Sequence, residues 1–253
     1  MFNVVAAELM KIRRPSISLA IATIIGTLSI GFTSFIFLKK NEATWADLAK
    51  FDGMTSSYNA VAAFMGFVAL TVFASQTSQE YTFGTLRNLL VRQPSRTKLF
   101  VGKFLAMSSF AVFFVAFTFI VSVGTSIALA KYQHFNVHSW TSHAGLKEAG
   151  KLLLNSFIAL IGYGSFGMSL GMILKSPMSA ISASLLWFLV IEGIIGSVVK
   201  GANQWMPGTA MAVVSSGGMK DFPYDRALIV SAVYVAVFMG ISGYLFHSRD
   251  VAQ

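Results

Sequence analysis

The chain has 253 residues, of which 55% are apolar and only 11% are charged, and it contains no cysteine. Soluble domains typically carry about 25% charged residues, so this chain has too few to cover a water-facing surface. The missing cysteines exclude disulfides and thiolate metal sites. The net charge of +9 suits loops that lie against anionic headgroups, and it does not by itself indicate nucleic acid.

Residues 1–14 are the first expected element. Their apolar residues recur at helical spacing, and basic residues close the segment: Phe2, Val5, Leu9 and Ile12, then Lys11, Arg13 and Arg14. This pattern predicts an amphipathic helix that lies in the membrane interface. Its expected role is to anchor the chain before it enters the bilayer.

Long apolar stretches follow, and each predicts a transmembrane helix. About 20 apolar residues are needed to cross the hydrocarbon core, and backbone groups in lipid must be satisfied within the segment. We therefore expect an all-α membrane protein with six transmembrane helices in a single permease-like domain, residues 1–253. The expected spans are 17–38, 56–78, 104–130, 152–174, 178–199 and 227–247. The first is longer than a signal peptide's core and lacks a clear cleavage site, so we expect it to be retained.

The loop between the second and third stretches carries a short amphipathic segment, 80–90. Glu80 stands where a carboxylate favours a helix N-terminus, and Pro94 ends the segment. Phe83, Leu86 and Leu90 fall on one helical face, with Arg87 and Asn88 turned away. Such a helix could rest on headgroups, or it could fill a groove on a cytoplasmic partner.

The same loop resembles a known family. Its pattern is Glu80-x3-Gly84-Thr85-Leu86-Arg87-x-Leu89-Leu90, followed by Pro94-x-Arg96-x3-Phe100-x2-Lys103. It is similar to the first cytoplasmic loop of type-2 ATP-binding-cassette (ABC) permeases. The six-helix count, the chain length, Glu192 and Pro207-Gly208 are also similar to that family. The resemblance implies a coupling helix that docks on an ATPase subunit. The residues it assigns to docking are Glu80, Tyr81, Phe83, Gly84, Thr85, Leu86, Arg87, Asn88, Leu89 and Leu90.

By this resemblance the chain is a permease subunit of an ATP-driven transporter that exports an amphiphilic small molecule or peptide. Its expected partners are cytoplasmic ATPase subunits, a second permease subunit (identical or a sibling) and the lipid bilayer. Mg-ATP is expected in the ATPase, and this chain itself is expected to bind no cofactor and catalyse no reaction. The likeness also favours a multi-pass protein of the cell membrane with both termini in the cytoplasm. Lys and Arg are divided almost equally between the two sides, so the positive-inside rule adds little.

Two other classes remain open. A secondary transporter or channel would need ion-coupling groups near the membrane midplane or inverted repeats, and only Glu192 is a candidate. A membrane scaffold or immunity protein would bind a partner without transport. Retention of an ATPase during purification distinguishes these classes from the permease.

The remaining motifs predict little chemistry. Residues 145–152 approach the phosphate-binding loop pattern, but Leu152 stands where Ser or Thr must hold magnesium. His134 and His138 could share a helical face with His143 nearby, yet no third zinc ligand has convincing spacing. Solvated loop histidines are the expected reading.

Three further features concern the membrane segments. Glu192 is the one ionisable residue well inside an expected span, where it could line a path, pair with another subunit or form a structural hydrogen bond. Gly167 and Gly171 form a small-xxx-small pair that predicts close helix packing within the subunit. The link at 175–177 predicts a tight hairpin, and the run 209–214 predicts a short re-entrant or interfacial element.

Overall fold

The computed structural model describes residues 2–12, 15–39, 42–92, 94–135 and 137–248. Arg13 and Arg14, which close the predicted N-terminal segment, lie outside the described residues. The helical elements are α1 (Phe2–Ile12), α2 (Pro15–Leu38), α3 (Glu42–Leu48), η1 (Gly53–Thr55), α4 (Ser56–Thr82), α5 (Thr85–Arg92), α6 (Arg96–Tyr132), η2 (His138–Thr141), α7 (His143–Leu174), α8 (Pro177–Leu186), η3 (Trp187–Ile191), α9 (Glu192–Val198), η4 (Ala202–Trp205), α10 (Pro207–Ser216) and α11 (Tyr224–Ser248).

Six helical segments in the described part of the chain are long and apolar enough to cross a membrane. They comprise α2, α4, α6, α7, the continuous run α8–η3–α9, and α11. The described residues form no strand, apart from one isolated β-bridge between Met219 and Phe222. The all-α, six-span fold class is therefore confirmed.

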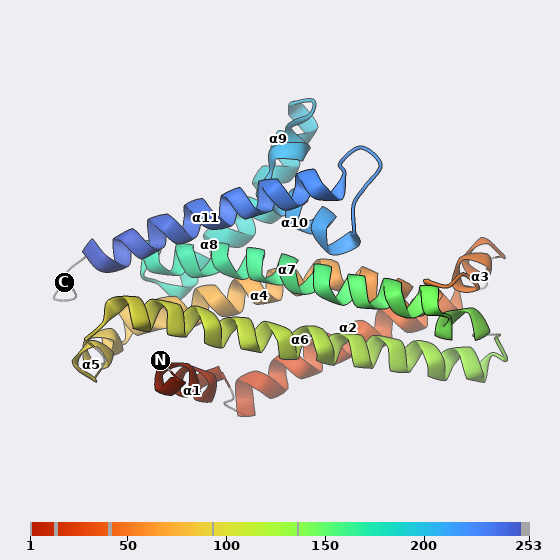
Figure 1. Cartoon of the computed structure of the whole chain (residues 1–253), viewed down its shortest axis with the longest axis horizontal. Helices are drawn as coiled ribbons and strands as arrows, with labels where there is room; N and C mark the ends of the chain where they lie inside the picture. Colours follow the sequence, from red (N-terminus) through yellow and green to blue (C-terminus); the bar gives the residue numbers. More distant parts are fainter. Residues whose placement is uncertain (1, 13–14, 40–41, 93, 136, 249–253) are drawn as a thin grey trace.

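The long helices run alongside one another and give the molecule two distinct ends (Figure 1). One end holds α1, α5 and the C-terminal end of α11, and we call it the α5 end. There, Arg96 of α6 donates to the backbone carbonyl oxygens of Phe246 and His247, both at 3.0 Å. The other end holds α3 and is called the α3 end, where the Trp140 indole donates to the Leu48 carbonyl at 2.8 Å.

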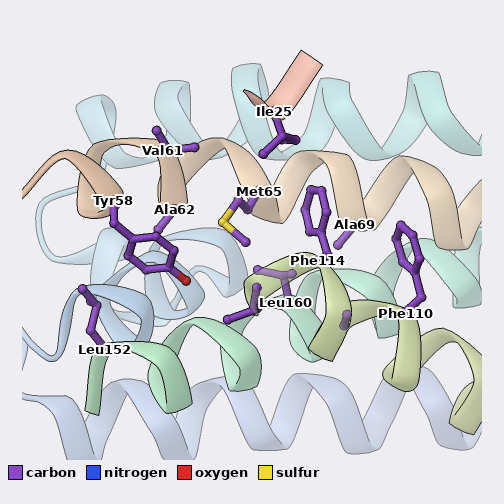
Figure 2. Close-up of a cluster of buried hydrophobic side chains, with 12 residues drawn as sticks. Ile25, Tyr58, Val61, Ala62, Met65, Ala69, Phe110, Phe114, Leu152 and Leu160 are labelled. Atoms are coloured by element: carbon purple, nitrogen blue, oxygen red, sulfur yellow. The ribbon is translucent and has the colours of Figure 1, made fainter. Parts of the chain in front are cut away.

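The main apolar core joins α2, α4, α6 and α7 in the middle of the bundle (Figure 2). Met65 of α4 is completely buried, and Leu160 of α7 and Phe114 of α6 are almost so. Lipid is as apolar as these side chains, so close van der Waals packing, rather than exclusion of water, holds such helices together.

Two glycines let α7 approach α4 closely. A Cβ at Gly167 would collide with the backbone carbonyl of Leu70, and one at Gly171 would lie 2.7 Å from the carbonyl oxygen of Ala74. Only glycine fits against backbone at this separation. The predicted close packing of this small-residue pair within the subunit is confirmed.

The short connections also follow their sequence signals. Lys175 adopts a left-handed conformation (φ 56°) that ends α7, and Pro177 begins α8 immediately afterwards. The predicted short element after α9 is the helix α10, which packs against α7 and α11. A π-helical turn, η3, interrupts the fifth span just before Glu192.

Candidate functional site

The chain leaves the membrane bundle at the end of α4 and turns sharply into α5. Gly84 has a φ of +62°, a conformation that glycine adopts without steric cost. Glu80 and Tyr81 lie in the last turn of α4, before this turn. The expectation that Glu80 begins the short helix is therefore wrong: the helix is α5, and it starts at Thr85.

One face of α5 is fixed to the bundle. Leu86 is only 4% exposed, and Leu89 and Leu90 are half-buried beside it. These side chains belong to an apolar cluster with residues of α1, α4, α6, α7 and α11, among them Val4, Tyr81, Leu99, Met172 and Phe246. Leu86 and Leu90 thus pack inward, whereas the amphipathic pattern alone left open that they anchor a partner. A displacement of α5 would be felt by most of the membrane helices.

The described side chains on the opposite face of α5 are exposed. Arg87 and Asn88 are exposed, and Val91 is 79% exposed. Phe83, in the turn before the helix, is 72% exposed. Phe83, Val91 and the Arg87 guanidinium thus form a small exposed surface at the helix and its preceding turn. Exposed apolar residues beside an arginine are a candidate surface for contact with another protein.

A closed ring of four charges, three of them buried and the fourth, Lys11, partly exposed, lies beneath this loop. Lys103 of α6 donates to Glu80 at 2.6 Å and to Glu8 of α1 at 3.3 Å. Lys11 of α1 donates to Glu80 at 2.7 Å and to Glu8 at 2.8 Å. Each ammonium therefore bridges both carboxylates, and the ring has no net charge. We call these four residues the charge ring.

Three of the four side chains in the charge ring are buried, so their charges must be paired. Lys103 is 1% exposed, and Glu8 and Glu80 are 4% and 5% exposed. Burial alone lowers the pKa of Lys11, which lies on α1 outside the spans, but the carboxylates of Glu80 and Glu8 outweigh it and raise that pKa above its ordinary value. Charges so placed are tolerated only when each is paired and hydrogen-bonded. In the sequence, the only signals were Glu8 and Lys11 three residues apart and Lys103 just before an apolar stretch.

A known protein family matches almost the whole helical bundle. The family described as "Protein of unknown function (DUF2705)" matches residues 19–252. The chain belongs to this family. The DUF2705 match runs from the first turns of α2 past the end of α11, so α1 precedes it. No curated protein matches the chain.

Glu192 of this DUF2705 chain is buried and held by three donors. Its carboxylate accepts from the Trp187 indole at 2.9 Å and from the backbone N–H groups of Gly208 at 3.0 Å and Thr209 at 3.2 Å. The last two are free N–H groups at the start of α10, so the carboxylate caps that helix. The Tyr163 hydroxyl donates to the Gly208 carbonyl at 3.0 Å and holds the same turn. Of the roles open from the sequence, this geometry favours the structural hydrogen bond.

We expect Glu192→Gln to lower the stability of the folded protein by about 1–3 kcal/mol. The substitution replaces one carboxylate oxygen with an NH2 group, so the N–H group of Gly208 or of Thr209 would lose its acceptor. Glu192→Ala should cost more, since it removes every acceptor from the start of α10. The thermal midpoint in detergent measures both. Equal midpoints for the wild type and both variants would show that the cap does not stabilise α10.

The remaining candidate motifs bring no reactive groups together. Residues 145–152 lie in the first turns of α7 and form helix, not a loop. His134 and His138 lie at the α3 end, and His143 opens α7. Within the described ranges, no group of three His, Asp or Glu is placed to hold a metal ion.

Proposed function

We propose that this chain is the membrane permease subunit of an ATP-driven transporter, whose ATP is hydrolysed by a separate subunit that docks on α5. The observation that carries the proposal is the two-faced construction of α5. Its Leu86 side is packed into a cluster shared with α1, α4, α6, α7 and α11, and its Arg87 side is exposed. A partner on the exposed side could move the membrane helices through the buried side. The resemblance of the 80–103 loop to type-2 ABC permeases supports the same role.

In this proposal the α5 end faces the cytoplasm of the cell membrane. That placement puts α1 and the end of α11 on the cytoplasmic side with the ATPase. The permease alternates between two helix packings, and the nucleotide state of the partner biases them. The export of an amphiphilic molecule or peptide follows from the resemblance alone.

A second permease subunit, identical or a sibling, completes the proposed path. Beyond Glu192, which caps α10, the helix α9 extends away from the long helices (Figure 1). Leu189, Ile194 and Val198 on the run η3–α9 are 57% exposed or more. A second subunit would cover this apolar face and add the helices that line the other half of a path.

Arg87→Glu is expected to reduce ATPase retention at least about tenfold, which corresponds to about 1.4 kcal/mol, because arginine is enriched among the few interface residues that dominate binding and the substitution also reverses its charge. The measurement is co-purification of an ATPase with this chain in mild detergent, detected as ATP hydrolysis by the purified complex. Lys147→Glu is the matched control, since it makes the same charge reversal at an exposed position of the α3 end. Leu86→Asp is not a clean test of docking, because Leu86 is buried.

Full retention of the ATPase by Arg87→Glu and by a Phe83→Ala, Val91→Ala pair would place docking elsewhere. Transport by the purified chain in liposomes without ATP would instead favour a secondary transporter. Against that class, the intramembrane acid Glu192 already has its hydrogen bonds satisfied by the protein. A partner that binds α5 but hydrolyses no ATP would favour the scaffold class.

A further inference from the structure

The charge ring connects three segments that are far apart in the sequence. Glu80 lies at the end of α4 and Lys103 lies near the start of α6, so their 2.6 Å ion pair closes the base of the loop that carries α5. Glu8 and Lys11 come from α1, which is separated from that loop in the sequence by α2, α3 and α4. We propose that α1 is a charge-locked strap, which docks across the base of the α5 loop and makes the adjoining ends of α4 and α6 one unit.

The spacing of the two α1 charges favours all-or-none docking. Glu8 and Lys11 are three residues apart and therefore share one helical face. Without α1, Glu80 and Lys103 still form a neutral pair. If only one α1 charge reached the ring, however, three charges would remain with one uncompensated. A helix that brings both charges at once avoids this state, because a buried unpaired charge is strongly unfavourable.

Apolar packing independently places α1 at the same point. A Cβ at Gly102 would lie 2.7 Å from a methyl carbon of Val4, so α1 rests directly on the α6 backbone beside Lys103. Met10, on the other side of α1, is 68% exposed. The helix is thus bound through a specific face to the protein, in addition to any contact that it makes with headgroups. An amphipathic helix that merely anchors the chain needs no acid on its buried face, yet Glu8 is 4% exposed.

The inference that α1 is a strap depends only on the contacts described above. What the strap does for transport depends in addition on the proposed function. If α5 receives force from an ATPase, the ring ensures that α4 and α6 receive it together. Loss of the strap would then leave the docking face of α5 intact but weaken the connection between docking and movement of the bundle.

Charge exchange tests the strap, and the absence of cysteine from the chain makes the readout specific. In a Val4→Cys background, the rate of maleimide labelling in native membranes reports how often α1 leaves α6. Glu8→Lys with Lys11→Glu would set like charges against Lys103 and Glu80, and labelling should accelerate at least about tenfold, the change that about 1.4 kcal/mol produces. This variant leaves the Glu80–Lys103 pair untouched, so the bundle should still fold, which its level in the membrane verifies.

Adding Glu80→Lys and Lys103→Glu restores the alternation of charge with every sign exchanged. Labelling of this fourfold variant should return toward the slow rate, a rescue that headgroup anchoring does not predict. Unchanged labelling in the α1 exchange, or no rescue in the fourfold variant at a normal membrane level, would overturn the strap. ATPase co-purification with the same variants is a separate measurement: if the ATPase never binds even the wild type, the proposed function fails, and the labelling result stands by itself.

Discussion

Lys103→Met is expected to lower the free energy of unfolding by about 3–5 kcal/mol, the range measured when one partner of a buried ion pair is removed. The substitution leaves the carboxylates of Glu8 and Glu80 inside the protein with only Lys11 between them. Methionine has nearly the same length as lysine, so the packing changes little and the loss is electrostatic. Thermal unfolding of the purified protein in detergent, followed by circular dichroism, measures the effect.

Two controls separate charge imbalance from any other consequence of the substitution. Glu80→Gln combined with Lys103→Met leaves Glu8 and Lys11 as a neutral pair, and it should recover most of the lost stability. Lys50→Met removes an exposed lysine whose pair with Asp47, at 2.7 Å, lies in water, so it should leave the stability nearly unchanged. A double variant as unstable as Lys103→Met alone would show that the charge ring is not the cause.

The membrane helices were predictable because lipid imposes one requirement on every spanning segment. Each expected span overlaps one of the six candidate spans in the structure. The helix bounds were less accessible, since apolarity marks only the part inside the bilayer. The stretch predicted at 104–130 lies within α6, which begins about two turns earlier at Arg96, capped by the Ser95 hydroxyl, and ends at Tyr132.

The residues that surround α5 were harder to predict, because their roles depend on tertiary contacts. Glu80 fits a helix start by its local pattern, yet its partners are Lys11 and Lys103, 69 and 23 residues away in the sequence. The sequence pattern around Leu86 fits a residue that anchors a partner as well as one that packs on the bundle. Only the fold shows that the bundle already covers the Leu86 side chain. The cap that Glu192 makes depends in the same way on α10. Local patterns identified these residues as unusual, but they did not identify what each one contacts.

Gly167→Val is expected to prevent normal packing of α7 on α4 and to cost at least about 3 kcal/mol, the upper part of the range for overpacked cores. The Cβ would collide with the Leu70 carbonyl, which is helix backbone and cannot rotate away as a side chain could. The helices α2 and α6 would have to adjust as well, because they share the main apolar core with α4 and α7. The measurements are the amount of folded protein in the membrane and its elution as a single species after detergent extraction.

Gly26→Val is the matched control for this prediction. Gly26 also lies in a spanning helix, α2, but a Cβ there would meet nothing within 4 Å. The two variants add the same side chain and carry the same helix propensity, so they differ chiefly in what surrounds the new carbon atoms. Near-normal folding of Gly26→Val with loss of Gly167→Val would locate the constraint at the α4–α7 contact. If both variants behaved alike, propensity would explain the effect, and close approach of these helices would lose its main support.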